Sequence, residues 1–329
     1  RGSIDGNPLD GIFRKVFIED VAATLNLKGG INIKSYVSEL SEQIAFSGEG
    51  LLPFKANIIF PPGQNLVMRF SGDLTNSYLE CNFLGFKKEK NQPGVLNFSW
   101  TKDEPTSFKF SSKNYDFNGF LIYDAEEIVK LEFSKVKLDD YFLGKASYTF
   151  NELQNFLLID GITYNHSNAP KYQFVPSDKN LQIKIKLSTV KIKPDLSLSN
   201  FTGSFDLSDK FYGDGLGRLN NGPEIKINVQ ADETRRVFKV FAKNAGDVLL
   251  ESNIYSSGYG GEIDFVLVQS PESESFGNLN VRNLRVIGAP FLAKLISLTS
   301  VKGIIDVLGS NGMIFDDISA NYKINNNLL

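Results

Sequence analysis

The chain has 329 residues, 42% of them hydrophobic, so it is long and apolar enough to bury the core of one large domain or two ordinary ones. Its 35 Lys and Arg nearly balance its 38 Asp and Glu, for a net charge of -3, so nothing suggests the basic surface that a nucleic acid partner requires, and none is expected. One cysteine, Cys81, and one histidine, His166, exclude an internal disulfide and leave almost nothing for a Cys/His zinc site.

The first half of the chain has the pattern of β-strands. Apolar and polar residues alternate, and Gly, Pro and Asn-Gly separate the segments, with a hairpin-type pair at Asn118-Gly119. We expect a β-groove segment over residues 1–165 and a second segment over residues 166–329. The stretch 161–180 between them, rich in Asn, Pro and Ser, is either a linker or a long loop within one continuous domain.

Three strands of the second half show the strongest apolar pattern. The clearest run begins at residue 181 and carries Lys and Gln on its opposite face. A second run begins at residue 224. A third, residues 261–269, has apolar residues at both odd and even positions, as expected of a strand that is covered on both faces. Their apolar residues form one candidate set: Leu181, Ile183, Ile185, Leu187, Ile225, Ile227, Val229, Ile263, Phe265 and Leu267.

Two turns are predicted between these strands. The sequence GDGLGR, residues 213–218, superficially resembles a glycine-rich phosphate loop, but no helical pattern follows it, so we predict a hairpin turn there. The pair Asn221-Gly222 predicts another hairpin turn.

The stretch APFLAKLISLTSVKGIIDVLGSNGMIF, residues 289–315, has helical rather than strand spacing. Pro290 suits a first helical turn, and Lys294 and Lys302 oppose a transmembrane span. The predicted amphipathic segment, near residues 290–308, either packs against the sheet or lies on lipid. Its apolar residues are Phe291, Leu292, Leu295, Ile296, Leu298, Ile304, Ile305 and Leu308.

An ordered series of small and apolar residues runs through residues 242–267 and 277–329. It comprises Ala245-Gly246, Leu249, Gly260-Gly261, Gly277, Leu279, Ala289-Pro290, Leu292-Ala293, Leu295, Ser297-Leu298, Ser300, Gly303, Asp306, Leu308, Gly312 and Phe315. This series resembles the YhdP-type branch of the AsmA-like superfamily, with its AG-x-x-L and GG segments and its AP-x-L-A-x-L-x-S-L motif. Before residue 242 only the Gly-punctuated strands suit the family.

The resemblance implies a bridge-like lipid transfer protein. Its fold would be an elongated, twisted antiparallel sheet curved into an open apolar groove, which carries phospholipid acyl chains across the periplasm of a Gram-negative bacterium and supports outer-membrane lipid homeostasis. Family members begin with an inner-membrane helix and continue into further strands, so we expect an internal fragment that reaches the inner and outer membranes through other regions. The ten apolar strand residues would line the groove, and the helical residues would plug or gate it.

Neither catalysis nor a cofactor is expected, because movement along an apolar track needs no reactive group. The pairs Asp139-Asp140 and Asp316-Asp317 lack the spacing of a calcium loop, so no metal site is expected. A single tryptophan, Trp100, disfavours a carbohydrate-active enzyme. Two alternatives stay open: the same alternation fills a closed sandwich, and an extended sheet edge suits a scaffold that binds outer-membrane assembly factors or other envelope proteins.

Overall fold

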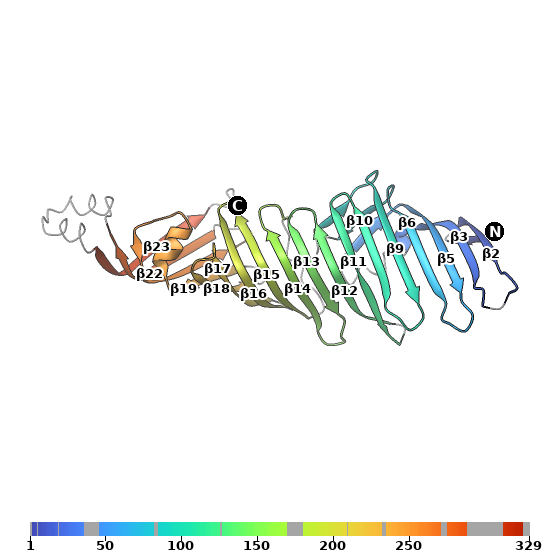
Figure 1. Cartoon of the computed structure of the whole chain (residues 1–329). Helices are drawn as coiled ribbons and strands as arrows, with labels where there is room; N and C mark the ends of the chain where they lie inside the picture. The colour runs from blue at the N-terminus through green and yellow to red at the C-terminus, as the bar shows by residue number, and fades with distance from the viewer. Residues whose placement is uncertain are drawn as a thin grey trace. The chain divides into compact units, whose positions relative to one another are not determined.

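The protein is mostly β-strand (Figure 1). Hydrogen bonds join twenty strands into one sheet that does not close on itself. The strand pairings within the described parts of residues 2–149 and within those of residues 181–324 are antiparallel. The predicted fold class, an open antiparallel sheet, is therefore confirmed. The computed structural model describes residues 2–4, 6–18, 20–35, 46–81, 85–125, 127–169, 180–208, 210–231, 235–270, 275–287 and 312–324.

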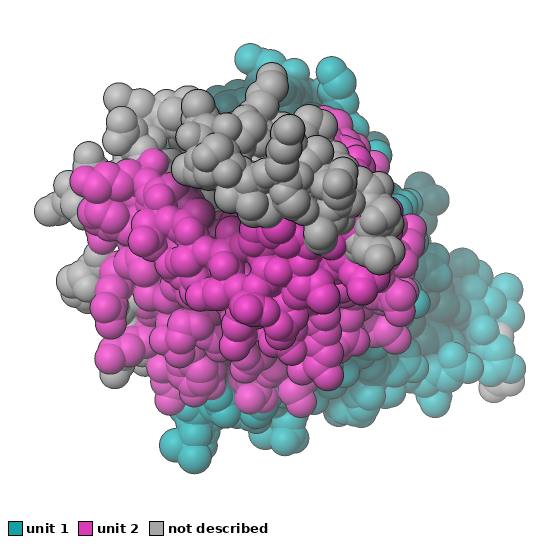
Figure 2. All heavy atoms as spheres, turned by 90° about the vertical axis from the view of Figure 1, so that its left-hand side faces the viewer, with its two compact units in different colours: residues 1–162, 168–175 teal, residues 163–167, 176–329 magenta. Residues whose placement is uncertain are grey.

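The chain divides into two compact units, teal and magenta in Figure 2. Unit 1 comprises Arg1–Ile162 and Asn168–Val175, and unit 2 comprises Thr163–Ser167 and Pro176–Leu329.

Unit 1 is a meander, in which strands pair with their neighbours along the chain. Its strands in the large sheet are β1 (Gly2–Ile4), β2 (Asn7–Arg14), β3 (Ala23–Asn32), β5 (Leu51–Phe60), β6 (Val67–Asp73), β9 (Gly94–Thr101), β10 (Thr106–Ser112), β11 (Tyr115–Asp124), β12 (Glu127–Leu138), β13 (Phe142–Thr149) and most of β14 (Asn155–Asn165). The alternation of apolar and polar residues explains these strands, because period-two spacing puts all apolar side chains on one face. In β5, for example, Leu52, Phe54 and Ala56 are buried while Lys55 is exposed.

A second, three-stranded sheet packs over part of this face. It consists of β4 (Phe46–Glu49), β7 (Tyr78–Cys81) and β8 (Phe86–Lys88). The Phe86 ring meets the rings of Tyr115, Phe110 and Phe117 at centroid distances of 4.7, 5.4 and 5.5 Å. The most completely buried side chains of unit 1 lie in or next to this sheet: Leu74, Ser77, Cys81 and Lys88.

Unit 2 continues the antiparallel pattern. Its elements are β15 (Leu181–Lys193), β16 (Leu196–Leu207), β17 (Phe211–Leu219), β18 (Glu224–Ala231), β19 (Arg236–Ala242), α2 (Ala245–Glu251), β20 (Gly258–Tyr259), β21 (Glu262–Gln269), β22 (Ser275–Val286) and β23 (Met313–Ile324).

The helix α2 is held by a short glycine segment. Asn244 caps its N-terminus by accepting a hydrogen bond from the Asp247 amide, at 3.1 Å. The amides of Ala245 and Gly246 donate to the carbonyl oxygens of Gly261 and Gly260, both at 2.9 Å. A side chain at Gly246 would collide with the Gly258 backbone. The AG-x-x-L and GG positions of the sequence therefore meet in one compact contact.

Two of the three turn predictions are wrong. GDGLGR lies inside β17, and Asn118-Gly119 lies inside β11, where the pairing with β12 shifts register. The glycines of β17 alternate with larger residues and are buried, so they serve packing within the sheet rather than chain reversal. The turn at Asn221-Gly222 is confirmed: it joins β17 to β18, and Asn221 has a φ of 65°.

Candidate functional site

The ten predicted apolar strand residues lie on one face of unit 2. Directly paired residues in an antiparallel sheet point to the same side, so strand registers define rows of neighbouring side chains. One row runs from β15 to β22 through Ile185, Gly203, Gly215, Ile227, Val240, Phe265 and Leu279. The next runs through Ile183, Phe205, Gly213, Val229, Phe238, Leu267 and Gly277. The structure thus brings residues from three distant segments together.

The remaining four residues share this face. Leu187, Ile225 and Ile263 stand two positions along their strands from members of the first row, and Leu181 stands two positions from Ile183. All four are buried.

Glycines of β17 make room on this face for two phenylalanines of β16. The Phe201 ring fills the space beside Gly215 and Gly217, and the Phe205 ring covers Gly213. Phe205 also stacks on Phe211, with ring centroids 5.5 Å apart. Sequence reasoning missed these phenylalanines, because the glycine run was interpreted as a turn.

The face of unit 2 is only partly buried. Ile183, Ile185, Ile227, Phe265 and Leu267, in the middle of their strands, are all of intermediate exposure. On the opposite face Lys184, Lys186 and Lys226 are exposed. The sheet is therefore apolar on one side and carries exposed lysines on the other.

Unit 1 has a corresponding apolar face that the sequence prediction did not locate. Its central row crosses β3, β5, β6, β9, β10, β11 and β12 through Leu27, Ala56, Phe70, Phe98, Phe108, Gly119 and Phe133. Rings adjoin along and beside this row: Phe54 stacks on Phe70 at 5.2 Å, and Phe70 lies 6.0 Å from Phe98. The alternation was visible in each segment, but only the register shows that the segments form one surface.

Few polar groups interrupt the apolar faces. The Thr106 side chain, opposite Leu121 in the register, is 5% exposed, and its hydroxyl has no hydrogen-bond partner in the described part of the chain. Burial raises the pKa of Tyr148 in unit 1 and of Tyr322 in unit 2 above the usual 10.0. Both phenols are therefore neutral at physiological pH, so they add no charge to these faces.

The predicted plug residues lie outside the described residues: Phe291, Leu292, Leu295, Ile296, Leu298, Ile304, Ile305 and Leu308. No helix in the described segments is long and apolar enough to cross a membrane. Nor do the described His, Cys, Asp and Glu residues form a cluster of three that could hold a metal ion.

The chain was compared with protein-family models, with curated proteins and with solved structures, and none of the three comparisons found a match.

Proposed function

We propose that this chain is a segment of a bridge-like lipid transfer protein, in which the apolar faces of the sheet carry the acyl chains of phospholipids. The proposal places it in the periplasm of a Gram-negative bacterium, between inner and outer membranes. It joins the resemblance of residues 242–329 to the AsmA-like superfamily with the arrangement of apolar side chains on the sheet.

One observation carries the proposal. Phe70, Phe98 and Phe108 lie in the middle of the unit 1 sheet, not at its edge, yet they keep intermediate exposure. In a closed sandwich, side chains at such central positions are covered by a second layer. The small sheet covers the region of Phe110 and Phe117, and the row centred on Phe98 is left partly accessible to an apolar ligand.

Contact with an apolar face lowers the free energy of a lipid's acyl chain substantially. Each CH₂ group moved from water onto an apolar surface gains about 0.8 kcal/mol. A continuous row of Leu, Ile and Phe side chains removes most of the penalty for an acyl chain in an aqueous compartment, and the headgroup stays in water. No catalytic group is needed, because no bond is made or broken.

The test is the lipid content of protein purified without detergent, measured by mass spectrometry of an organic extract. We expect phospholipid at a reproducible molar ratio. The double variant Ile183→Glu with Ile227→Glu places charges in adjacent rows of the unit 2 face, and we expect it to lower the recovered phospholipid by the share that unit 2 holds, since buried charge opposes acyl contact.

The matched control carries Lys184→Glu and Lys226→Glu on the opposite face, where both side chains are exposed. This control should keep the wild-type phospholipid ratio, and circular dichroism must show that both variants retain their β content. A lipid-free extract from folded wild-type protein, or equal losses in the two variants, would contradict the proposal and favour the scaffold alternative.

A further inference from the structure

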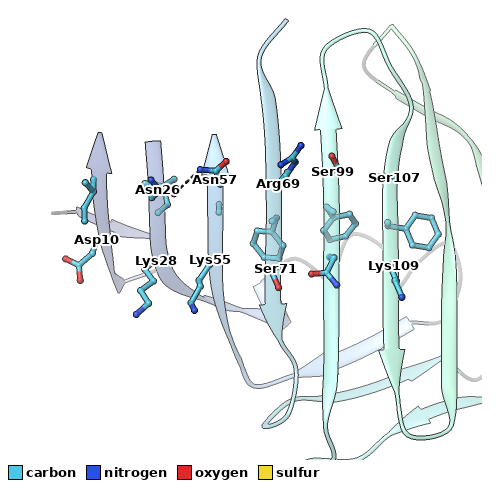
Figure 3. A pocket seen from close by; sticks show the side chains of 17 residues that line it. Asp10, Asn26, Lys28, Lys55, Asn57, Arg69, Ser71, Ser99, Ser107 and Lys109 are labelled. Atoms are coloured by element: carbon cyan, nitrogen blue, oxygen red, sulfur yellow. Dashed lines mark hydrogen bonds between the residues drawn. The ribbon is translucent and has the colours of Figure 1, made fainter. Parts of the chain in front are cut away.

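The polar face of unit 1 contains a trough of about 670 Å³ across β2, β3, β5, β6, β9 and β10 (Figure 3). Two rows of paired residues flank it. One consists of Ile12, Asn26, Asn57, Arg69, Ser99 and Ser107. The other consists of Asp10, Lys28, Lys55, Ser71, Asn97 and Lys109.

The trough is separate from the apolar face. The row between the two flanking rows is that of Leu27, Phe70 and Phe98, whose side chains point to the opposite side because neighbours along a strand alternate. The floor of the trough is therefore the backbone of this row. In Figure 3 the labelled side chains of the two flanking rows stand on either side of that row.

The trough is basic. Lys28, Lys55, Arg69 and Lys109 are all exposed, and within the described segments none of them belongs to an ion pair. Asp10, on the outermost strand, is the one carboxylate among the lining residues described. A chain with a net charge of -3 thus gathers four cationic side chains and one carboxylate in a single concave strip, and an anionic ligand complements it.

The neutral residues that line the trough indicate that its anionic ligand also carries hydroxyl groups. Asparagine and serine side chains stand between the cations, and Asn57 already donates to the Asn26 side-chain oxygen at 2.9 Å. Amides and hydroxyls in this arrangement hydrogen-bond well to ligand hydroxyl groups. The aromatic rings of Phe70, Phe98 and Phe108 point to the other face, so the trough lacks the stacking platform that single-stranded nucleic acid uses.

The form of the trough favours a linear ligand over a flat membrane surface. It follows the direction across the strands and, at a strand spacing of about 4.8 Å, extends roughly 24 Å from β2 to β10. Lys28, Lys55 and Lys109 occupy one flank of this path and Arg69 the other, so a chain in the trough meets cations on both sides.

We propose that this trough, defined by Lys28, Lys55, Arg69 and Lys109, binds an acidic polysaccharide chain that lies across the strands. Carboxylate groups of the ligand pair with the four cations, and its hydroxyl groups bond to the asparagine and serine side chains. The proposal does not depend on lipid transfer, because it concerns the opposite face of the sheet.

The experiment is isothermal titration calorimetry of the full chain with a short oligogalacturonate, and with a neutral maltooligosaccharide of the same length. We expect binding of the acidic oligomer only, weakening as salt is added. The double variant Lys55→Gln with Lys109→Gln should weaken it about tenfold or more, since each lost partner is a charge-assisted hydrogen bond.

The matched control is Lys184→Gln with Lys186→Gln, which removes the same charge from exposed positions in unit 2 and should bind like wild type. Three results would overturn the proposal: no binding of oligogalacturonate by wild type, equal weakening in both double variants, or equal affinity for the neutral oligomer. Capture by phosphatidylglycerol vesicles, lost in the Lys55/Lys109 variant, without oligogalacturonate binding would assign the trough to a membrane surface instead.

Discussion

Lys88 is the residue whose burial is hardest to reconcile with its charge. It is 0% exposed, and its ammonium donates to the carbonyl oxygens of Ser77 at 2.9 Å and Glu89 at 3.2 Å. The end of β8 is thereby tied to the loop around Ser77. A fully buried lysine is tolerated only where such acceptors replace its water shell.

Burial lowers the pKa of Lys88 below its usual 10.5, and this gives stability a defined pH dependence. Between the lowered folded-state pKa and 10.5, the unfolded chain binds the proton that the folded chain has released, so the free energy of unfolding rises with pH. We expect wild type to gain stability relative to Lys88→Met as the pH is raised from 8 towards 10.

Urea denaturation of both proteins across this pH range measures the difference. Taking the difference between the two proteins removes the contributions of tyrosines such as Tyr78, whose raised pKa acts at the same alkaline pH. A stability difference that stays constant with pH would show that the Lys88 ammonium has the same pKa in the folded and unfolded states.

At the scale of elements, the contact between α2 and the glycine segment makes a matched test possible. Gly260 and Gly261 both have positive φ, 64° and 75°. A Cβ at Gly260 would meet nothing within 4 Å, whereas one at Gly261 would lie 2.7 Å from the Arg282 carbonyl oxygen. The two positions therefore share backbone strain and differ in steric contact.

We expect Gly260→Ala to destabilise unit 2 by about 1 kcal/mol, the usual penalty for a side chain at positive φ. Gly261→Ala should lose a further 1–3 kcal/mol, roughly, because the backbone must shift to relieve the collision. Thermal unfolding monitored by circular dichroism compares them directly, and equal losses would show that strain alone fixes this segment.

The sequence predicted strands better than it predicted their connections. Ile183 and Ile227 were recognised from alternation alone, because the two-residue period of a strand is imposed residue by residue. The prediction of a turn at Gly213 was wrong. A glycine that leaves room for a phenylalanine of the neighbouring strand looks the same in the local sequence as a glycine at which the chain reverses. Only pairing with β16 distinguishes the two cases.

Strand registers also explain why the sequence did not predict the apolar face of unit 1. Phe70 and Phe98 become neighbours through the pairing of β6 with β9, across the segment that forms β7 and β8. Likewise Lys28 and Lys109 are 81 positions apart in the sequence and share one row only after four strand pairings are fixed. Composition and periodicity carry no information about such long-range registers.

At the scale of the whole molecule, each unit carries an apolar face of its own. If both faces hold acyl chains, a charge on one should leave the other occupied. We expect Phe98→Glu in unit 1 to lower the recovered phospholipid partly, and its combination with Ile183→Glu and Ile227→Glu in unit 2 to lower it further, because burial of charge excludes the acyl chain locally.

Quantitative lipid mass spectrometry against protein concentration tests this. Asn97→Glu, one position away and on the polar face, is the control for Phe98→Glu and should not change the ratio. A complete loss of phospholipid from the unit 1 change alone would contradict independent occupancy of the two faces.

The meander of unit 1 also has a consequence for how such a chain arises and folds. In unit 1 most strands pair with the next strand of the same sheet along the chain, so folding can advance hairpin by hairpin as the chain emerges. A duplicated hairpin can join the sheet while leaving earlier pairings intact. The length of such a sheet can therefore change in evolution by the gain or loss of one hairpin, that is, two strands at a time.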